Sequence, residues 1–150
     1  MSHYIIRGGN RLEGALKIHG AKNAALPILA AAAICGDSVI RNCPNLTDIS
    51  VAMEILRHLG CGALRQGDAI VTTQGEAGDC RIPDQLMGAM RSSIVFLGGM
   101  VARHGCAELA LPGGCELGAR PIDLHLAALE RMGARITETG GRLLCSAPEG

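Results

Sequence analysis

Hydrophobic and polar residues are distributed along the chain in a way that predicts two successive sets of helices and strands. For the first set we predict, in chain order, a helix, a strand, a second helix and a hairpin, at residues 24–35, 38–42, 47–59, and 61–65 with 69–73. The first helix is rich in Ala and Leu, which favour helix, and it is apolar nearly all round, so it should be buried. The second helix is amphipathic, and Thr47 or Asp48 should cap its start. Two short strands are predicted ahead of this set, at residues 4–7 and 15–19.

The same order of elements returns in the second half of the chain. We predict a helix, a strand, a second helix and a hairpin at residues 90–102, 106–111, 120–132, and 134–138 with 142–145. The two halves match at a spacing of about 70 residues, with Lys22 aligned to Arg91. The spacing grows by about four residues at one place, where the turn 43–46 of the first copy becomes the loop 112–119 of the second. The pattern therefore predicts a duplicated βαβαββ-type unit with one enlarged loop, which is either tolerated drift or a functional addition.

Composition and charge exclude several classes of protein. The sequence is 48% hydrophobic and 19% charged, which is typical of a globular domain. Its net charge is zero, which argues against a protein that binds nucleic acid or a membrane surface through bulk charge. The seven cysteines include no CxxC pair and no zinc-type spacing, so we expect reduced thiols and no metal. Without a secretory signal or an apolar run long enough for a bilayer, the cytoplasm is the expected location.

The candidate for chemistry is Cys115, which lies in the glycine-rich loop 112–119 just ahead of a predicted helix start. Pro121 is favoured at the first position of a helix. A thiol beside a cation, here Arg120, and beside a helix N-terminus has the surroundings that lower a cysteine pKa. The alternative is a surface turn that happens to contain a cysteine, and this stretch alone favours neither.

Three cations, Lys22, Arg91 and Arg120, fall at or just before predicted helix N-termini. The helix dipole disfavours a cation there, so something else should hold these side chains. Helix N-termini bind anions, and a cation beside one makes a phosphate or carboxylate site. Each cation alone is as well explained by solvent exposure, but the repetition favours a site. Asn23 could add hydrogen bonds to it, while Asp123 and His125 could contact a neutral polar group of a ligand.

Three stretches together resemble the enolpyruvyl transferase family, in particular its branch that acts on UDP-N-acetylglucosamine. They read GAKNAALP at residues 20–27, MRSS at 90–93 and PGGCELGARPIDLH at 112–125. The resemblance runs from about Ile6 to the end of the chain, and it implies an α/β (α+β) fold, an inside-out α/β barrel built from βαβαββ repeats. Residues 1–21 would hold N-terminal strands that pair with a second domain. Residues 22–150 would form part of the first domain, with two repeats at about 22–75 and 88–146.

The resemblance also implies an activity and a set of site residues. The enolpyruvyl group of phosphoenolpyruvate would move to the 3-hydroxyl of UDP-N-acetylglucosamine with release of phosphate, the first committed step of peptidoglycan precursor synthesis, which serves the cell wall, cell shape and cell division. Cys115 would donate the proton to carbon, and no cofactor or metal is implied. Phosphoenolpyruvate would be bound by Lys22, Asn23 and Arg120, and UDP-N-acetylglucosamine by Asn23, Arg91, Arg120, Pro121, Ile122, Asp123 and Leu124. The base and a further substrate arginine would come from the second domain.

Three other functions remain open on the sequence. The related family branch that acts on shikimate 3-phosphate shares the fold but lacks the cysteine motif of this loop. A truncated or non-catalytic domain that binds a nucleotide sugar would explain the missing second domain. A thiol-redox protein using Cys115 is disfavoured because no resolving cysteine lies nearby in the sequence.

Overall fold

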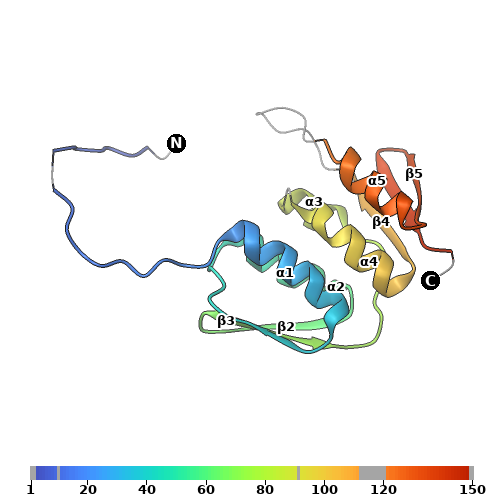
Figure 1. The fold of residues 1–150 in the computed structure, drawn as a ribbon, viewed down its shortest axis with the longest axis horizontal. Coiled ribbons are helices and arrows are strands. Elements are labelled where there is room, and N and C mark those ends of the chain that lie inside the picture. The colour runs from blue at the N-terminus through green and yellow to red at the C-terminus, as the bar shows by residue number, and fades with distance from the viewer. Residues whose placement is uncertain (1–2, 10, 91, 112–120, 149–150) are drawn as a thin grey trace.

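The computed structural model describes residues 3–9, 11–90, 92–111 and 121–148, and Figure 1 shows their arrangement. The helices are α1 (Lys22–Cys35), α2 (Thr47–His58), α3 (Asp84–Ala89), the 3-10 turn η1 (Ser93–Val95), α4 (Phe96–His104) and α5 (Asp123–Arg131). The strands are β1 (Ser38–Ile40), β2 (Cys61–Gln66), β3 (Ala69–Gln74), β4 (Cys106–Ala110), β5 (Arg135–Thr139) and β6 (Arg142–Ser146). From residue 22 on, the element types follow the predicted order, and α3 is an addition.

Helix α1 lies between α2 and α4 and contacts both of them (Figure 1). Gly99 of α4 makes this close packing possible, since a Cβ placed there would lie 3.0 Å from the carbonyl oxygen of Ala30. Pro27 lies in the second turn of the helix, so the one helical bond that it removes is that to the carbonyl of Asn23, which is exposed to solvent at the start of the helix. Ile28 and Ile34 on the remaining side are about half exposed, so the prediction of burial all round is wrong for that face.

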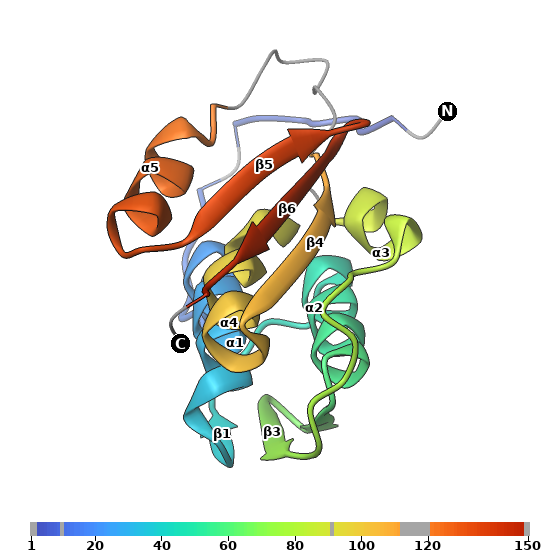
Figure 2. The same ribbon diagram turned by 90° about the vertical axis from the view of Figure 1, so that its right-hand side faces the viewer.

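Two antiparallel sheets of three strands flank the helices, and their strand orders are the same, β1-β3-β2 and β4-β6-β5. In each sheet the last strand lies in the middle, paired with both earlier ones; Figure 2 looks onto the second sheet. Arg81 adds a single parallel bridge to Glu108 of β4, which supplies the first β of the second βαβαββ unit. The duplicated unit is confirmed by this shared topology.

A single hydrophobic core fills the space between the helices and the inner faces of the sheets. Phe96, the one phenylalanine, is fully buried among aliphatic side chains. Every second residue of a strand points to the same face, so Leu109 of β4 and Leu143 of β6, which pair in register, both reach the core. Burial of these alternating positions holds each sheet against the helix that precedes it in sequence.

Several predicted boundaries were wrong. Residues 4–7 and 15–19 are not paired as strands within the described residues, and their apolar side chains are exposed, so their expected pairing with a second domain stays a prediction. The helix expected at 90–102 begins later, because Met90 has an extended backbone and a 3-10 turn precedes α4. Neither Thr47 nor Asp48 caps α2: the N-cap is Leu46, which makes no side-chain capping bond, and Asp48 bonds elsewhere.

Candidate active site

The predicted site begins at the N-terminus of α1. Lys22 is its first residue, and the Lys22 Nζ atom donates a hydrogen bond of 2.7 Å to the Asp48 carboxylate in the first turn of α2. This ion pair explains why a cation can occupy the N-terminus of a helix. The Asp48 carboxylate compensates the unfavourable interaction of the Lys22 charge with the helix dipole. Asn23 follows in the first turn of α1 and is exposed. Asp48 is the residue that the sequence analysis missed at this site; its place in the sequence suggested a helix cap.

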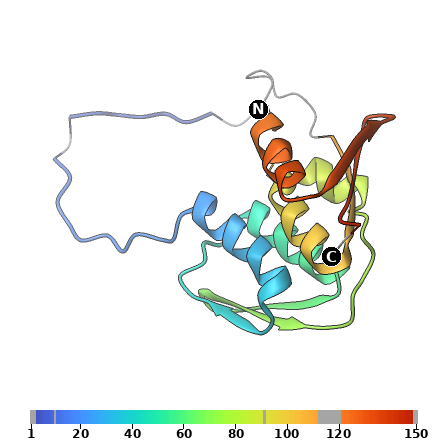
Figure 3. The same cartoon turned by 45° about the vertical axis from the view of Figure 1, so that its right-hand side comes forward.

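The fold brings several chain segments to this same end of the molecule. The Lys22–Asp48 contact places the N-termini of α1 and α2 side by side. Helix α4 runs alongside α1 in the same direction (Figures 1 and 3), so Ser92, which follows Arg91 in the chain, begins the second repeat there. Strand β4 runs back toward that end, where Leu111 donates a backbone hydrogen bond of 2.9 Å to Gly141. Arg91, Cys115 and Arg120 lie outside the described residues.

A second group of predicted residues surrounds the start of α5. Ile122 is the N-cap residue, and its carbonyl accepts the first helical bond, 3.0 Å from the N–H of Leu126. Pro121 and Asp123 are exposed, and the Leu124 side chain is 81% exposed. Within the described residues no hydrogen bond or ion pair joins this group to Lys22 or Asn23. An exposed apolar side chain beside an exposed carboxylate suits contact with a ligand that has apolar and polar parts.

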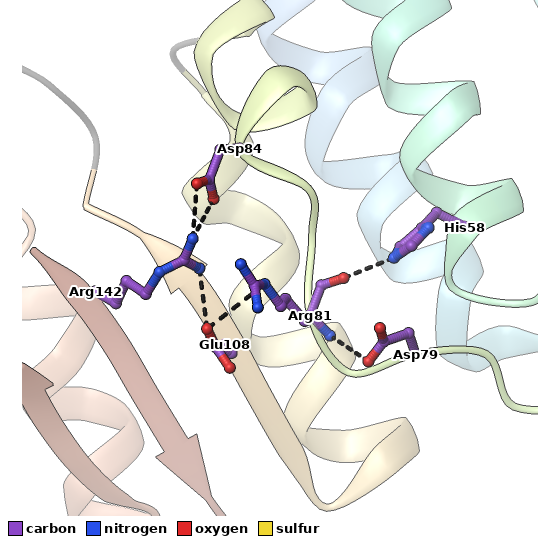
Figure 4. A network of polar contacts seen from close by, with 6 residues as sticks. All are labelled: His58, Asp79, Arg81, Asp84, Glu108 and Arg142. Carbon is purple, nitrogen blue, oxygen red and sulfur yellow. Dashed lines mark hydrogen bonds and ion pairs between the residues drawn. The ribbon is translucent and has the colours of Figure 1, made fainter. Parts of the chain in front are cut away.

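A charged network ties the second sheet to the segment that connects the repeats (Figure 4). One terminal nitrogen of Arg142 lies 2.6 and 2.7 Å from the two Asp84 carboxylate oxygens, and the other lies 2.9 Å from Glu108. The Nε atom of Arg81 lies 3.6 Å from the same Glu108 carboxylate. Two cations here face two anions, so the network is balanced and its role is to hold β6, β4 and α3 together. Among the described residues no group of three or more acidic, histidine or cysteine side chains could hold a metal ion.

The described cysteines separate into buried and accessible thiols. Burial raises the pKa of Cys43, Cys61 and Cys145, with nearby Arg65 opposing this at Cys43 and Arg103 at Cys61. These three are packed in the core, as expected for cysteines within apolar runs. Because all three thiols are buried, a substrate cannot reach them, so none of them is suited to nucleophilic or acid–base work.

Comparison with known proteins defines the class of protein. Residues 6–146 match the family described as EPSP synthase (3-phosphoshikimate 1-carboxyvinyltransferase). The chain belongs to this family of enolpyruvyl transferases, and its helices and sheets adopt part of that family's fold without closing a barrel. No described helix has the length and apolar character needed to span a membrane.

Two individual proteins show how much of the family this chain represents. The protein "UDP-N-acetylglucosamine 1-carboxyvinyltransferase 2" of Caldanaerobacter subterraneus subsp. tengcongensis is 47% identical over 146 residues, which cover 97% of this chain and 35% of the relative. The crystal structure of the enolpyruvyl transferase NikO from Streptomyces tendae matches with a TM-score of 0.76 and 27% identity, over 94% of this chain and 31% of that one. The chain thus spans about a third of the length of these proteins.

Proposed function

We propose that this chain forms part of an enzyme that transfers the enolpyruvyl group of phosphoenolpyruvate to the 3-hydroxyl of UDP-N-acetylglucosamine and releases phosphate. The observation that carries the proposal is the 47% identity over nearly the whole chain to a relative named for that activity. The activity would serve peptidoglycan precursor synthesis in the cytoplasm, and through it cell shape and division. The chain also retains Lys22, Asn23, Arg91, Cys115 and Arg120 together.

The charge at the start of α1 supports binding of phosphoenolpyruvate. In the structure Lys22 pairs with Asp48, and both side chains remain partly exposed, so an anion can approach the ammonium group. Phosphoenolpyruvate would take Lys22, Asn23 and Arg120, because a phosphate and a carboxylate together need clustered donors. Asp48 would then keep Lys22 oriented while the substrate neutralises its charge. The aligned N-termini of α1, α2 and α4 add the positive ends of three helix dipoles.

Cys115 would supply the proton to the methylene carbon of the enolpyruvyl group as the sugar hydroxyl adds to the neighbouring carbon. Protonation of carbon needs an acid held in place, and a thiol can serve as that acid when its pKa is tuned by nearby cations. The tetrahedral intermediate would then lose phosphate from one carbon and a proton from the new methyl group, which restores the double bond. The same thiol could add to phosphoenolpyruvate and form a covalent adduct that intact mass would detect.

UDP-N-acetylglucosamine would contact Asn23, Arg91, Arg120, Pro121, Ile122, Asp123 and Leu124. The arginines suit the diphosphate, since guanidinium groups bind phosphate oxygens through two parallel hydrogen bonds. The exposed Leu124 and Asp123 at the start of α5 would meet the apolar and polar edges of the nucleoside. The base that takes the sugar proton, and a further arginine, would come from the second domain.

The test compares phosphate release with substrate binding in one sample, in which this chain is studied together with the second domain. Phosphate release that needs both phosphoenolpyruvate and UDP-N-acetylglucosamine supports the proposal, and Cys115→Ser should abolish release while titration calorimetry still detects the nucleotide sugar. Cys35→Ser, which removes an exposed thiol at the other end of α1, is the matched control and should change neither. Binding of the sugar by every variant without any release favours the non-catalytic domain. Release with shikimate 3-phosphate instead would favour the related branch and contradict the proposal.

A further inference from the structure

Two cysteines outside the proposed active site lie next to each other where the second repeat begins. Cys80 belongs to the segment that enters the repeat, and Cys106 is the first residue of β4. The Glu108 N–H donates a hydrogen bond of 2.7 Å to the Cys80 carbonyl, and the Ile82 N–H donates one of 3.2 Å to the Glu108 carbonyl. These bonds form the parallel bridge between Arg81 and Glu108, so the two cysteines lie on neighbouring extended segments.

The spacing of neighbouring strands matches the reach of a disulfide. Adjacent strands lie about 4.8 Å apart, and a disulfide joins Cα atoms separated by about 4.4–6.8 Å. With Arg81 opposite Glu108, the parallel register places Ala107 opposite Cys80, so Cys106 lies one residue from the position opposite Cys80. Both cysteines line the same cavity, and Cys106 is the largest influence on the pKa of Cys80.

Both thiols are accessible from outside. Cys80 and Cys106 are partly exposed and line a cavity of about 420 Å³ over the outer face of the second sheet. Arg135, Thr137 and Ser146 line the same cavity together with Ala107 and Leu144, and most of the lining surface is apolar. Cys145 also borders it, but its side chain is buried at 3% exposure. A small oxidant can therefore reach the first two thiols more easily than the third.

We propose that Cys80 and Cys106 are a redox modification site, at which a hydroperoxide converts the two thiols into a reversible intramolecular disulfide. In the first step the sulfur of Cys106 attacks the peroxide, which forms a sulfenic acid and releases water or an alcohol. In the second step the sulfur of Cys80 attacks the sulfur of Cys106, its thiol proton leaves with the hydroxyl group as water, and the S–S bond forms. One peroxide is reduced for each disulfide, and the two sulfurs together lose two electrons and two protons.

The electrostatics distinguish the roles of the two cysteines. The pKa of Cys80 rises to about 11, first because of the hydrogen bond with Cys106, then through burial and the charges of Cys106 and Asp79. Cys80 therefore stays protonated at neutral pH and is the slower nucleophile. Cys106 then reacts first with peroxide, and Cys80 resolves the sulfenic acid because it is already in contact.

The disulfide would enclose residues 81–105, which hold α3, η1 and α4 as well as Arg91 at the start of the second repeat. Closing this loop limits the unfolded chain, so the oxidised protein should melt at a higher temperature than the reduced one. This proposal can be tested independently of the proposed transferase activity. Its test detects a covalent bond between two cysteines and adds no substrate.

The experiment treats the folded Cys115→Ser chain with hydrogen peroxide and maps the peptides without reduction. The expected result is a mass decrease of two hydrogen atoms, a linked peptide pair containing Cys80 and Cys106, and full reversal by dithiothreitol. Cys80→Ser and Cys106→Ser should each remove the linked pair, whereas Cys35→Ser should keep it. Sulfinic acid at Cys106 without a linked peptide, or a pair that contains Cys145 instead, would overturn the proposal. If Cys80→Ser or Cys106→Ser fails to fold, the peptide map of the chain that retains both cysteines still shows whether the disulfide forms.

Discussion

The two repeats share one topology, yet their second helices lie in different surroundings. Helix α2 buries six side chains, whereas α5 buries one, Leu129. Residues at equivalent positions after these helices show the same contrast, since Leu59 is fully buried and Met132 is 75% exposed. The reason is contact: α2 packs against α1, α3 and β2, while α5 packs mainly against β5. One pattern of apolar residues therefore makes a core helix in the first repeat and a surface helix in the second.

This contrast suggests different roles for the two repeats: the first completes the core, and the second presents residues that can bind a ligand. The first repeat has a short turn between its first strand and second helix, and its residues complete the core. The second repeat has the longer loop with Cys115, and it leaves the start of α5 open to solvent. Exposed loop residues on a rigid scaffold are where binding groups are usually placed. We expect substitutions in the first repeat to lower stability and those around α5 to change binding.

The largest difference is expected between Leu59→Ala and Met132→Ala. The first substitution empties a fully buried position and should lower the free energy of unfolding by about 2–5 kcal/mol. The second removes a mostly exposed side chain and should change it by less than about 0.5 kcal/mol. Urea unfolding followed by circular dichroism measures both values. Equal losses would show that α5 is covered in solution and would remove the contrast between the repeats.

The glycines that end α2 and α5 sharpen the comparison. Gly60 and Gly133 both have positive φ, +84° and +100°, so alanine should cost about 1–2 kcal/mol at either site through backbone strain. A Cβ on Gly60 would also overlap the Glu76 carbonyl oxygen, whereas a Cβ on Gly133 meets nothing within 4 Å. Gly60→Ala should therefore lose a further ~1–3 kcal/mol because of crowding. Thermal melts of the two variants measure the difference, and a larger loss for Gly133→Ala would contradict this explanation.

Arg103 joins the two repeats and has no counterpart in the first, where Ile34 occupies the equivalent position. Its terminal nitrogens donate hydrogen bonds of 2.8 Å to the carbonyls of Ala33 and Gly75. Arg103→Ala leaves these acceptors without their partner, and we expect a loss of about 1–2 kcal/mol in unfolding free energy. Arg103→Lys should recover part of it, because an ammonium group reaches one carbonyl at a time. Arg131→Ala, an exposed control on α5, should be neutral, and a matching loss there would refute a specific role for Arg103.

The smallest effect is a pH dependence from His104, the last residue of α4. Burial lowers its pKa, the Arg103 charge lowers it further, and Asp79 partly opposes both. Because the folded pKa lies below the unfolded value of about 6.5, the unfolded chain binds the proton more tightly. Stability should thus be full above that pH and fall as the pH drops through it toward the folded pKa. Melting temperatures across this range should decline less in His104→Gln than in His19→Gln, an exposed control; parallel declines would exclude His104 as the source.

Helix and strand types were predictable from the sequence because local patterns determine them. The hairpin strands 61–65 and 69–73 lie within one residue of the observed strands, since alternation and the turn at Gly67 define them. The strands predicted at residues 4–7 and 15–19 are unpaired among the described residues of this chain, because a strand needs a partner and pairing is not encoded in a single segment; their pairing with a second domain stays a prediction. Helix α3 was missed because it spans only six residues, too few to show a helical period.

The sequence identified candidate residues of the site, but it could not show which side chains contact one another. Lys22, Asn23 and the residues at the start of α5 were found from motif and position, and their roles stay predictions. Asp48 could not be recognised, because its partner Lys22 lies 26 residues away in sequence and only the packing of α1 against α2 brings them together. The Cys80 and Cys106 thiols were missed for the same reason, since their contact depends on the parallel bridge at Arg81.

The central place of α1 has a consequence for how the protein folds as it is made. Chains emerge from the ribosome N-terminus first, and structural units fold in that order. Residues 22–74 contain α1, α2 and the whole first sheet, so this unit can assemble before α4 has been synthesised. Until α4 arrives, the alanine-rich side of α1 that it covers stays open to water. During translation that surface is the natural point of capture for a chaperone, and slow synthesis of residues 75–104 would prolong its exposure.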